Sequence, residues 1–214
     1  IVVIGGLADR LGRVRMTVLG FWLSIAGSIL VGLAPSGALA ESVLMIGRIL
    51  QGLSGAFIMP ASLALIKAYW DGASRQRAIS YWSMGSWGGS GFAALFGGLM
   101  AENVGWRWIF FAGAAISLLG MFMVLGTPES KEPPKAGYRF DLTGVLSFMV
   151  FMVALQVFVT QGGNMGWASL PSLALLVISI VFAVLFFRIE SGNPNAFVDF
   201  GLFRNLTYTG ATIS

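Results

Sequence analysis

The 214-residue chain contains no cysteine and no histidine, and only 10% of its residues are charged. The lack of cysteine and histidine excludes disulfides, thiol nucleophiles, His-based triads and zinc sites. A soluble domain carries roughly 25% charged residues, so this chain has too little polar surface to cover itself in water. Hydrophobic residues make up 57% of the chain, and the mean hydropathy is +0.83. The composition therefore predicts a membrane protein.

Six apolar stretches have the length of a membrane span, which is about 20 residues for a helix. They cover residues 16–34, 43–66, 78–101, 108–126, 142–161 and 169–188. Further apolar residues stand at both ends of the sequence, at 1–4 and from Leu206 onward. We therefore expect an all-α membrane protein with six full transmembrane helices and two partial ones, forming a fragment of a longer protein.

Positive charge is concentrated in alternate connections between these spans. The connections at 9–15, 67–77, 127–141 and 188–205 contain 11 of the 13 Lys and Arg residues. Cytoplasmic loops of membrane proteins carry an excess of Lys and Arg, so we place these four connections in the cytoplasm. The net charge of +4 follows from this topology. Because no basic stripe remains after this sorting, we expect no nucleic-acid partner.

Carboxylates are absent from the depth of the expected spans. All nine Asp and Glu residues fall in connections or at their edges, whereas a proton-coupled carrier needs a group that exchanges protons within the membrane. We therefore expect any coupling carboxylate outside this chain. The one charge inside a span is Arg48, which costs at least about 2.5 kcal/mol on the insertion scale and so needs a partner or access to water.

Arg48 lies on a distinct face of its span. Polar and small residues share this face at 100° per residue, namely Gln51, Gly52, Gly55 and Met59. Leu50 and Phe57 lie on the opposite face. This pattern predicts a cavity wall on one side and a lipid-facing surface on the other. The alternative is that Arg48, about five residues from the outer end, only extends its guanidinium to the outer surface.

The expected span at 78–101 is the least apolar of the six and contains six glycines. The members of interest are Gly85, Gly89, Gly97 and Gly98. Gly85 and Gly89 form a GxxxG pair, which lets helix backbones approach closely. Two interpretations fit this composition: tight helix packing, or a helix whose packing changes as a cavity opens and closes.

The segment at 5–15 combines glycine, acid and arginine in a definite order. Gly5 and Gly12 permit a sharp reversal of the chain, and Asp9 suits the positive N-terminal end of the following helix. Arg10 and Arg13 can pair with Asp9, or they can serve as the positive charges that keep this segment on the cytoplasmic side. We expect a cytoplasmic loop joining two spans. Its combination of Gly, Asp and Arg residues in this order is more than the membrane topology alone requires.

These residues resemble motifs of the major facilitator superfamily. The string GGLADRLGRVRM at 5–16 resembles the signature G-x-L-a-D-r-x-G-r-k between the second and third family helices. RILQG at 48–52 resembles the R-x-x-q-G motif of the fourth helix, which the family ties to proton transfer and substrate translocation. The fifth helix should carry an antiporter motif ending in G-P-x-x-G-G. Gly97 and Gly98 match its end, but Ala93 and Ala94 replace the Gly-Pro pair.

The later part of the chain resembles the fourteen-span drug:proton antiporter branch (QacA/EmrB-like). Two more spans, joined by the short outer turn 162–168, follow the sixth family helix, and 195–205 resembles the segment before the ninth. The resemblance implies a partial facilitator half at 1–126, a cytoplasmic linker at 127–141 and two extra transmembrane helices at 142–188. A cytoplasmic loop and the start of the next helix follow at 189–214.

The resemblance implies a proton-coupled multidrug efflux antiporter that exports hydrophobic or cationic compounds from a bacterium. It would be multi-pass in the plasma (inner) membrane and contact membrane lipids. Arg48 and Gln51 would line the cavity, Asp9, Arg10 and Arg13 would gate the cytoplasmic face, and the glycine helix would rock against a C-terminal half outside this chain. No cofactor is expected, because the proton gradient supplies the energy.

Two alternatives remain. A facilitator-family carrier of a sugar, peptide or metabolite is favoured by the missing Gly-Pro pair. A non-transporting membrane scaffold or regulatory subunit is the alternative of another class, since half a carrier lacks a second wall for its cavity. An enzyme is not expected, because no Ser-His, His-metal or paired intramembrane carboxylate arrangement is available.

Overall fold

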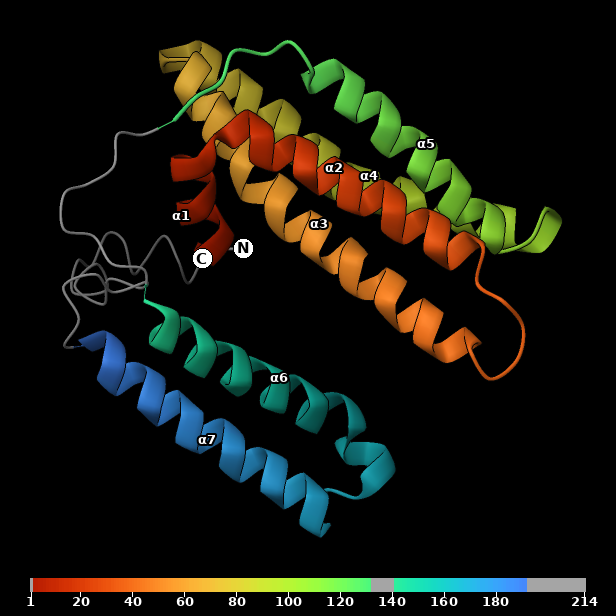
Figure 1. Cartoon of the computed structure of the whole chain (residues 1–214), viewed down its shortest axis with the longest axis vertical. Coiled ribbons are helices and arrows are strands. Elements are labelled where there is room, and N and C mark those ends of the chain that lie inside the picture. Colours follow the sequence, from red (N-terminus) through yellow and green to blue (C-terminus); the bar gives the residue numbers. More distant parts are fainter. Residues whose placement is uncertain (1, 132–140, 192–214) are drawn as a thin grey trace. The chain divides into compact units, whose positions relative to one another are not determined.

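The computed structural model describes residues 2–131 and 141–191, and these residues form helices and short connections without any strand. The helices are α1 (Val2–Leu11), α2 (Arg13–Gly32), α3 (Ala40–Tyr69), α4 (Gly72–Asn103), α5 (Arg107–Val124), α6 (Leu142–Met165) and α7 (Leu170–Ser191) (Figure 1). The loop and helix start expected at 189–214 lie outside the described residues beyond Ser191. The all-α fold class is confirmed.

The expected spans coincide with the six long helices, α2 to α7. Five of these, α2, α3, α5, α6 and α7, are long and apolar enough to cross a membrane. The remaining helix, α4, has 32 residues but is less apolar, as the sequence indicated for 78–101. The 10-residue α1 takes the place of the first partial span. The chain is therefore a multi-pass membrane protein.

The chain divides into two compact units, Ile1–Pro134 and Lys135–Ser214. The division falls within the stretch 127–141 that the sequence predicts as a linker. The first unit contains α1 to α5 and the second contains α6 and α7. Each unit is described by itself below.

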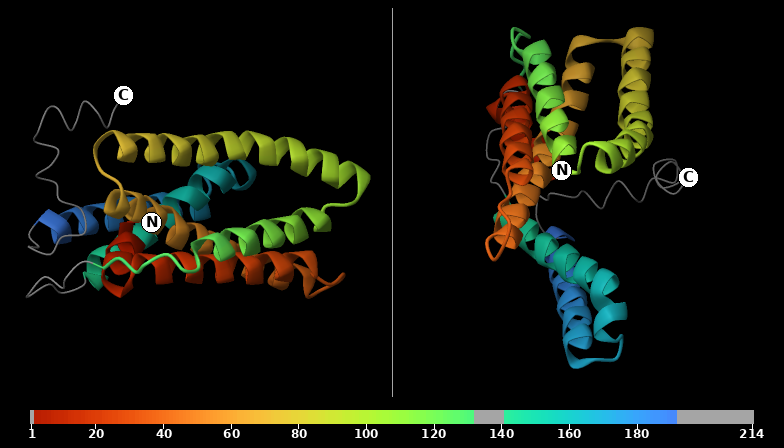
Figure 2. Two further views of the ribbon diagram at one scale, coloured as in Figure 1. Left: turned by 90° about the horizontal axis from the view of Figure 1, so that it is seen from above. Right: turned by 90° about the vertical axis from the view of Figure 1, so that its right-hand side faces the viewer.

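Consecutive long helices of the first unit run antiparallel (Figure 2). Within this unit, the chain reversals after α1, α3 and α5, all expected in the cytoplasm, lie at one end, where the hydroxyl of Tyr69, at the end of α3, donates to the carbonyl of Pro128, after α5. We call this the inner end. At the other, outer end the Arg107 guanidinium of α5 donates to the carbonyl oxygen of Ala34 at 3.1 Å.

Helix α2 is the centre of the first unit, because it packs against both α3 and α5. Glycines allow this close approach. A Cβ added at Gly27 would lie 2.8 Å from the carbonyl oxygen of Gly47 in α3, and one added at Gly32 would lie 2.9 Å from the Phe111 ring of α5. Ser24 and Ser117 join α2 to α5 by a 2.8 Å hydroxyl hydrogen bond. We call this packed group the α2–α3–α5 core.

Helix α4 lies apart from that core and contains no buried residue. Trp82 donates its indole N–H to the Ser62 hydroxyl of α3 at 3.1 Å. A Cβ added at Gly97 would reach only the tip of Ile109, at 3.9 Å, and one added at Gly85, Gly89 or Gly98 would meet no atom within 4 Å. The interpretation that these glycines pack tightly is therefore wrong within the described residues.

The second unit is an antiparallel hairpin of α6 and α7. Asp141 begins α6 by accepting hydrogen bonds from the Gly144 amide and the Thr143 hydroxyl, both at 2.9 Å. The rings of Phe148 and Phe186 pack across the hairpin with centroids 5.1 Å apart. Small residues are buried between the helices, including Gly144, Ser147, Ala154, Ser172 and Ser179. Because α6 continues to Met165, the outer turn is shorter than the expected 162–168.

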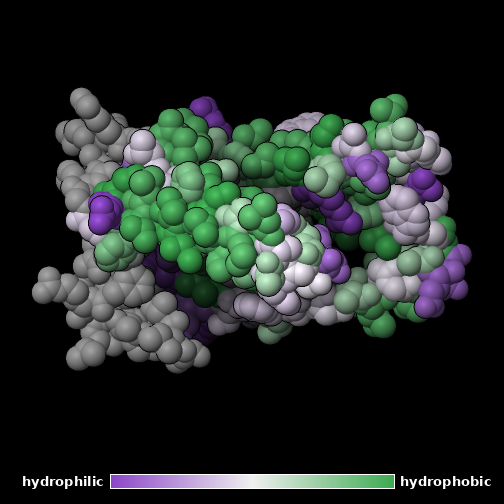
Figure 3. Space-filling model, turned by 90° about the horizontal axis from the view of Figure 1, so that it is seen from below, coloured by the Kyte–Doolittle hydropathy of each residue, from purple (hydrophilic) through white to green (hydrophobic). Residues whose placement is uncertain are grey.

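The outside of both units is apolar. Leu119 is 64% exposed, Met123 is 84% exposed and Leu170 is 83% exposed. Figure 3 shows extensive apolar surface on the face in view. Such exposure suits helices surrounded by lipid, since lipid tails are as apolar as the side chains they contact.

Candidate functional site

The Gly-Asp-Arg segment is mainly helical, so the expected loop at 9–15 is wrong. Helix α1 continues to Leu11 and α2 begins at Arg13, which leaves Gly12 as the break between them. Gly12 has a φ of +118°, a conformation that side chains with a Cβ rarely adopt. Gly5 lies within α1, where an added Cβ would lie 3.4 Å from Cβ of Pro60 in α3. The chain direction therefore changes at one glycine rather than along a loop.

Asp9 and Arg13 form an ion pair across this break. The Arg13 guanidinium donates from Nε to the Asp9 carboxylate at 2.8 Å and from Nη1 to the Ser130 hydroxyl at 3.0 Å. This pairing, one of the two roles that the sequence allowed for Arg13, thus has the geometry of a charge-assisted hydrogen bond. Arg10 lies in the last turn of α1. The pair ties the end of α1 to the start of α2 and to the segment after α5.

Glu129 is part of this group, although no motif in the sequence pointed to it. Its carboxylate accepts from the backbone amides of Val14 at 3.0 Å and Arg15 at 3.2 Å, which are first-turn N–H groups without partners inside α2. A Cβ added at Gly12 would lie 2.6 Å from the Glu129 carboxyl carbon. The sequence held one indication of this contact: Glu129 follows Pro128 in a connection that is expected on the same side of the membrane as the start of α2. We call Asp9, Gly12, Arg13, Glu129 and Ser130 the inner cluster.

A hollow of about 490 Å³ opens beside the inner cluster. It is lined by the Asp9–Arg13 pair and by the inner half of α3, including Pro60 and Lys67. The wall formed by Asp9 and Arg13 is therefore charged, and the α3 wall is apolar except for Lys67. In the described residues, no three acidic side chains are grouped so that they could hold a metal ion.

Arg48 and Gln51 form a second group nearer the outer end of α3. The Arg48 guanidinium donates to the Gln51 side-chain carbonyl at 3.3 Å, and the Gln51 amide donates to the Ser28 hydroxyl of α2 at 3.0 Å. Ser28 is 4% exposed, so Gln51 connects the exposed Arg48 to the α2–α3 interface. The guanidinium also lies over the Phe110 ring of α5, with Cζ 4.9 Å from the ring centroid.

The faces of α3 differ in part from the expectation. Gly52, Gly55 and Met59 are exposed, as a cavity wall requires. The face with Leu50 and Phe57 was expected to meet lipid, but it packs against Gly27 and Gly20 of α2. The expectation was wrong for Leu50 and Phe57, because helical periodicity separates two faces without telling which of them meets a neighbouring helix. Ile46 and Leu53, which the periodicity places on the same face, are exposed.

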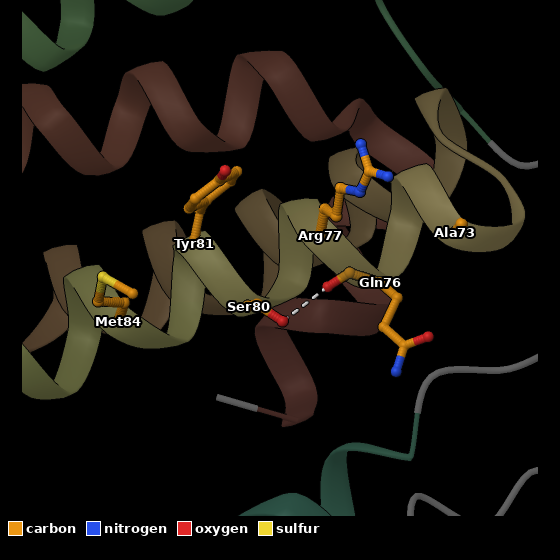
Figure 4. Close-up of a pocket in the computed structure, with 6 residues that line it drawn as sticks. All are labelled: Ala73, Gln76, Arg77, Ser80, Tyr81 and Met84. Atoms are coloured by element: carbon orange, nitrogen blue, oxygen red, sulfur yellow. Dashed lines mark hydrogen bonds between the residues drawn. The ribbon is translucent and has the colours of Figure 1, made fainter.

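The glycine helix carries a hollow of about 350 Å³ on its inner half. Arg77 and Tyr81 point to the same side of α4, and Gln76 points away (Figure 4). All residues that line this hollow belong to α4. It is therefore an open surface of one helix and does not by itself enclose a ligand.

The sequence profile described as Major Facilitator Superfamily matches residues 1–202. The chain belongs to the Major Facilitator Superfamily. Curated relatives in this family include two described as "Quinolone resistance protein NorB" of Staphylococcus aureus. The protein of strain MRSA252 is 45% identical over 210 residues, which cover 98% of this chain and 44% of the relative. That of strain bovine RF122 / ET3-1 is 45% identical over 214 residues, covering 100% of this chain and 45% of the relative.

The chain thus spans less than half the length of these facilitator relatives. The family consists of transporters, which agrees with a protein whose described residues form membrane helices. The superfamily motifs noted in the sequence lie in three places in the structure: at the inner cluster, around Arg48 on α3, and on α4. Phe110, Ser28 and Glu129 were not identified from those motifs, because each joins its group from another helix or connection.

Proposed function

We propose that these residues are part of a proton-coupled multidrug efflux carrier of the fourteen-span branch, in a bacterial plasma membrane. The observation that carries the proposal is the 45% identity, across almost the whole chain, with two proteins named for quinolone resistance. The substrates would be hydrophobic or cationic compounds, exported in exchange for protons. A further half of the carrier would supply the second cavity wall, and no bound cofactor would be needed.

The proposal gives Arg48 and Gln51 the wall of the transport cavity. Arg48 is exposed on α3 while Gln51 anchors it to Ser28, so the cation is held at the surface of the α2–α3–α5 core rather than inside it. A guanidinium in that place stabilises the ionised form of a nearby carboxylate. We assign it the role of tuning proton exchange at an acid outside this chain.

The inner cluster would act as the gate at the cytoplasmic face. It joins α1, α2 and the segment after α5 through Asp9, Arg13 and Glu129. Alternating access requires one half of a carrier to move largely as a rigid body against the other. Ties of this kind keep the inner ends of these helices together during such a movement, while α4, with its open glycine face, would move against the other half.

The test is efflux of a cationic dye in everted vesicles that contain the complete carrier. Arg48→Ala should abolish proton-driven transport, and Arg48→Lys should retain part of it because the charge remains. Arg77→Ala is the matched control, since it removes an exposed arginine outside the Arg48 group. Unchanged transport by Arg48→Ala would remove Arg48 from the mechanism.

A carrier of another solute is the second candidate, and Ala93 and Ala94 in place of Gly-Pro favour it. A proton ionophore distinguishes the two. It should stop dye efflux by an antiporter, whereas a facilitator would continue to equilibrate its solute. A scaffold or regulatory subunit would show no transport in either assay.

The fourteen-span topology can be tested with single cysteines at Gly163 and Ala196. Gly163 lies in the last turns of α6, and Ala196 lies outside the described residues. An impermeant maleimide should label the first from outside the cell and the second from the cytoplasm. Labelling from the same side would refute the extra hairpin.

A further inference from the structure

Two arginines and two aromatic rings form a continuous chain of contacts at the outer end of the α2–α3–α5 core. The Arg107 guanidinium lies 4.7 Å from the Trp106 ring centroid. The rings of Trp106 and Phe110 meet edge to face, with centroids 5.9 Å apart at 82°. Arg48 lies over Phe110 at 4.9 Å. We call Arg107, Trp106, Phe110 and Arg48 the aromatic ladder.

The ladder connects α3 to α5 although both helices pack mainly against α2. Arg48 reaches across from α3 to the ring of Phe110, while its hydrogen bond to Gln51 stays within α3. The Gln51 bond is a single contact at 3.3 Å, near the long limit for a hydrogen bond. Phe110 therefore gives Arg48 a contact from another helix.

The other end of the ladder is attached to the connection that follows α2. Arg107 donates to the carbonyl oxygen of Ala34, just beyond α2, while its guanidinium covers Trp106. Cation–π contacts are stronger where water is excluded, and Trp is the best of the rings. An edge-to-face pair such as Trp106 and Phe110 has the geometry that aromatic quadrupoles favour.

We propose that Phe110 is a positioning residue for Arg48, and that Trp106 and Arg107 hold Phe110 in place. The connection between α4 and α5 at the outer surface thereby sets where the embedded charge of the carrier lies. This inference rests on the proposed function in giving Arg48 a part in transport. The contact itself, however, can be tested without transport.

Substitutions at Phe110 and Phe111 form a matched pair. Phe111 stands next to Phe110 on α5, but it packs on Gly32 and Trp108. In the complete carrier, Phe110→Leu should lower the rate of cationic-dye efflux by roughly threefold or more, the rate equivalent of a lost exposed cation–π contact. Phe110→Trp should retain the rate, and Phe111→Leu should leave it closer to the native value than Phe110→Leu does.

The order of these variants separates positioning from packing. A residue that only filled space would tolerate Leu better than the larger Trp, because added volume in a packed site is destabilising. A cation–π contact requires the opposite order, since Leu has no π face. Leu performing as well as Phe, or better than Trp, would overturn the inference.

A double-mutant cycle tests the contact whatever the transport result. Phe110→Leu should lower the melting temperature of the purified carrier more in the native background than in Arg48→Met, which keeps an unbranched apolar side chain. Equal shifts in the two backgrounds would overturn the inference. If Arg48→Ala transports normally while the two shifts differ, the contact stands and the proposed role of Arg48 fails. If Arg48→Ala is inactive while the shifts are equal, only the ladder fails.

Discussion

Helices α3 and α4 are neighbours in the chain and of similar length, yet Gly47 of α3 and the GxxxG glycines of α4 have opposite surroundings. Gly47 of α3 faces Gly27 of α2, so closely that a Cβ added at Gly47 would lie 3.0 Å from the Gly27 carbonyl oxygen. Gly85 and Gly89 of α4 face open space. The GxxxG spacing occurs on α4, where no helix of the described first unit covers it, while the close backbone contact occurs between single glycines of α2 and α3.

This difference shows that a glycine pattern reports a capacity for close packing rather than a contact. In lipid, helices associate through van der Waals packing and interhelical hydrogen bonds. The α2–α3–α5 core has both, through its glycines and the Ser24–Ser117 pair. Helix α4 is joined to α3 by the hydrogen bond from the Trp82 indole to the Ser62 hydroxyl, but its glycines face open space. The core is therefore expected to respond to substitution and α4 to tolerate it.

Gly27→Ala should have the largest effect on stability. Its new Cβ would lie 2.8 Å from the Gly47 carbonyl oxygen, and this backbone atom cannot move aside as the end of a side chain could. We expect a loss of about 1–3 kcal/mol, as for other overpacked sites, measured as a lower melting temperature in detergent. An unchanged melting temperature would show that α2 and α3 do not approach as described.

Glu129→Ala should have the next largest effect, because it removes the acceptor for two amides at the start of α2. The loss of a helix N-terminal cap costs about 1 kcal/mol. Glu129→Gln is the control, since its carbonyl oxygen can still accept while its charge is lost. A melting temperature of Glu129→Ala equal to that of the native carrier would contradict capping from the segment after α5.

Ser24→Ala should lower stability by a smaller amount. It leaves the Ser117 hydroxyl without its 2.8 Å partner between α2 and α5. Interhelical hydrogen bonds in membranes average about 0.6 kcal/mol. The double variant Ser24→Ala with Ser117→Ala should cost less than the sum of the two single changes, and strict additivity would argue against the bond.

Gly89→Ala should have the smallest effect on melting temperature, because its Cβ would meet no atom within 4 Å. We expect a change within about 0.5 kcal/mol, in the stabilising direction since alanine favours helix. The same substitution at Gly27 is the matched comparison. A loss at Gly89 as large as at Gly27 would end the distinction between α4 and the core, and would indicate that another segment of the carrier covers α4.

Much of the outline could be predicted from the sequence. The apolar stretches located the six long helices to within a few residues at most of their ends, because hydropathy over a window is a local property. Asp9 pairs with Arg13 across the break at Gly12, which is one of the two roles that the sequence allowed for these arginines. The segment containing them was wrongly expected to be a loop, because a Gly-rich and charged stretch can also continue a helix up to a single break at Gly12.

The partners of the site residues could not be predicted in the same way. Glu129 lies 115 positions from Val14, and Phe110 reaches Arg48 from a different helix. Such contacts depend on how each helix is rotated about its axis and which neighbour it meets. Neither quantity is contained in hydropathy or in a motif.

By itself, the sequence determined that this is a membrane protein, where its long helices run, which connections carry its positive charge and which family motifs it contains. All of these depend on composition and spacing along one segment at a time. Only the tertiary structure decided that Glu129 caps α2, that Phe110 lies under Arg48, and that the glycines of α2 and α3 rather than those of α4 are in contact. These are properties of pairs of helices, set by the distances between surfaces that are far apart in the chain.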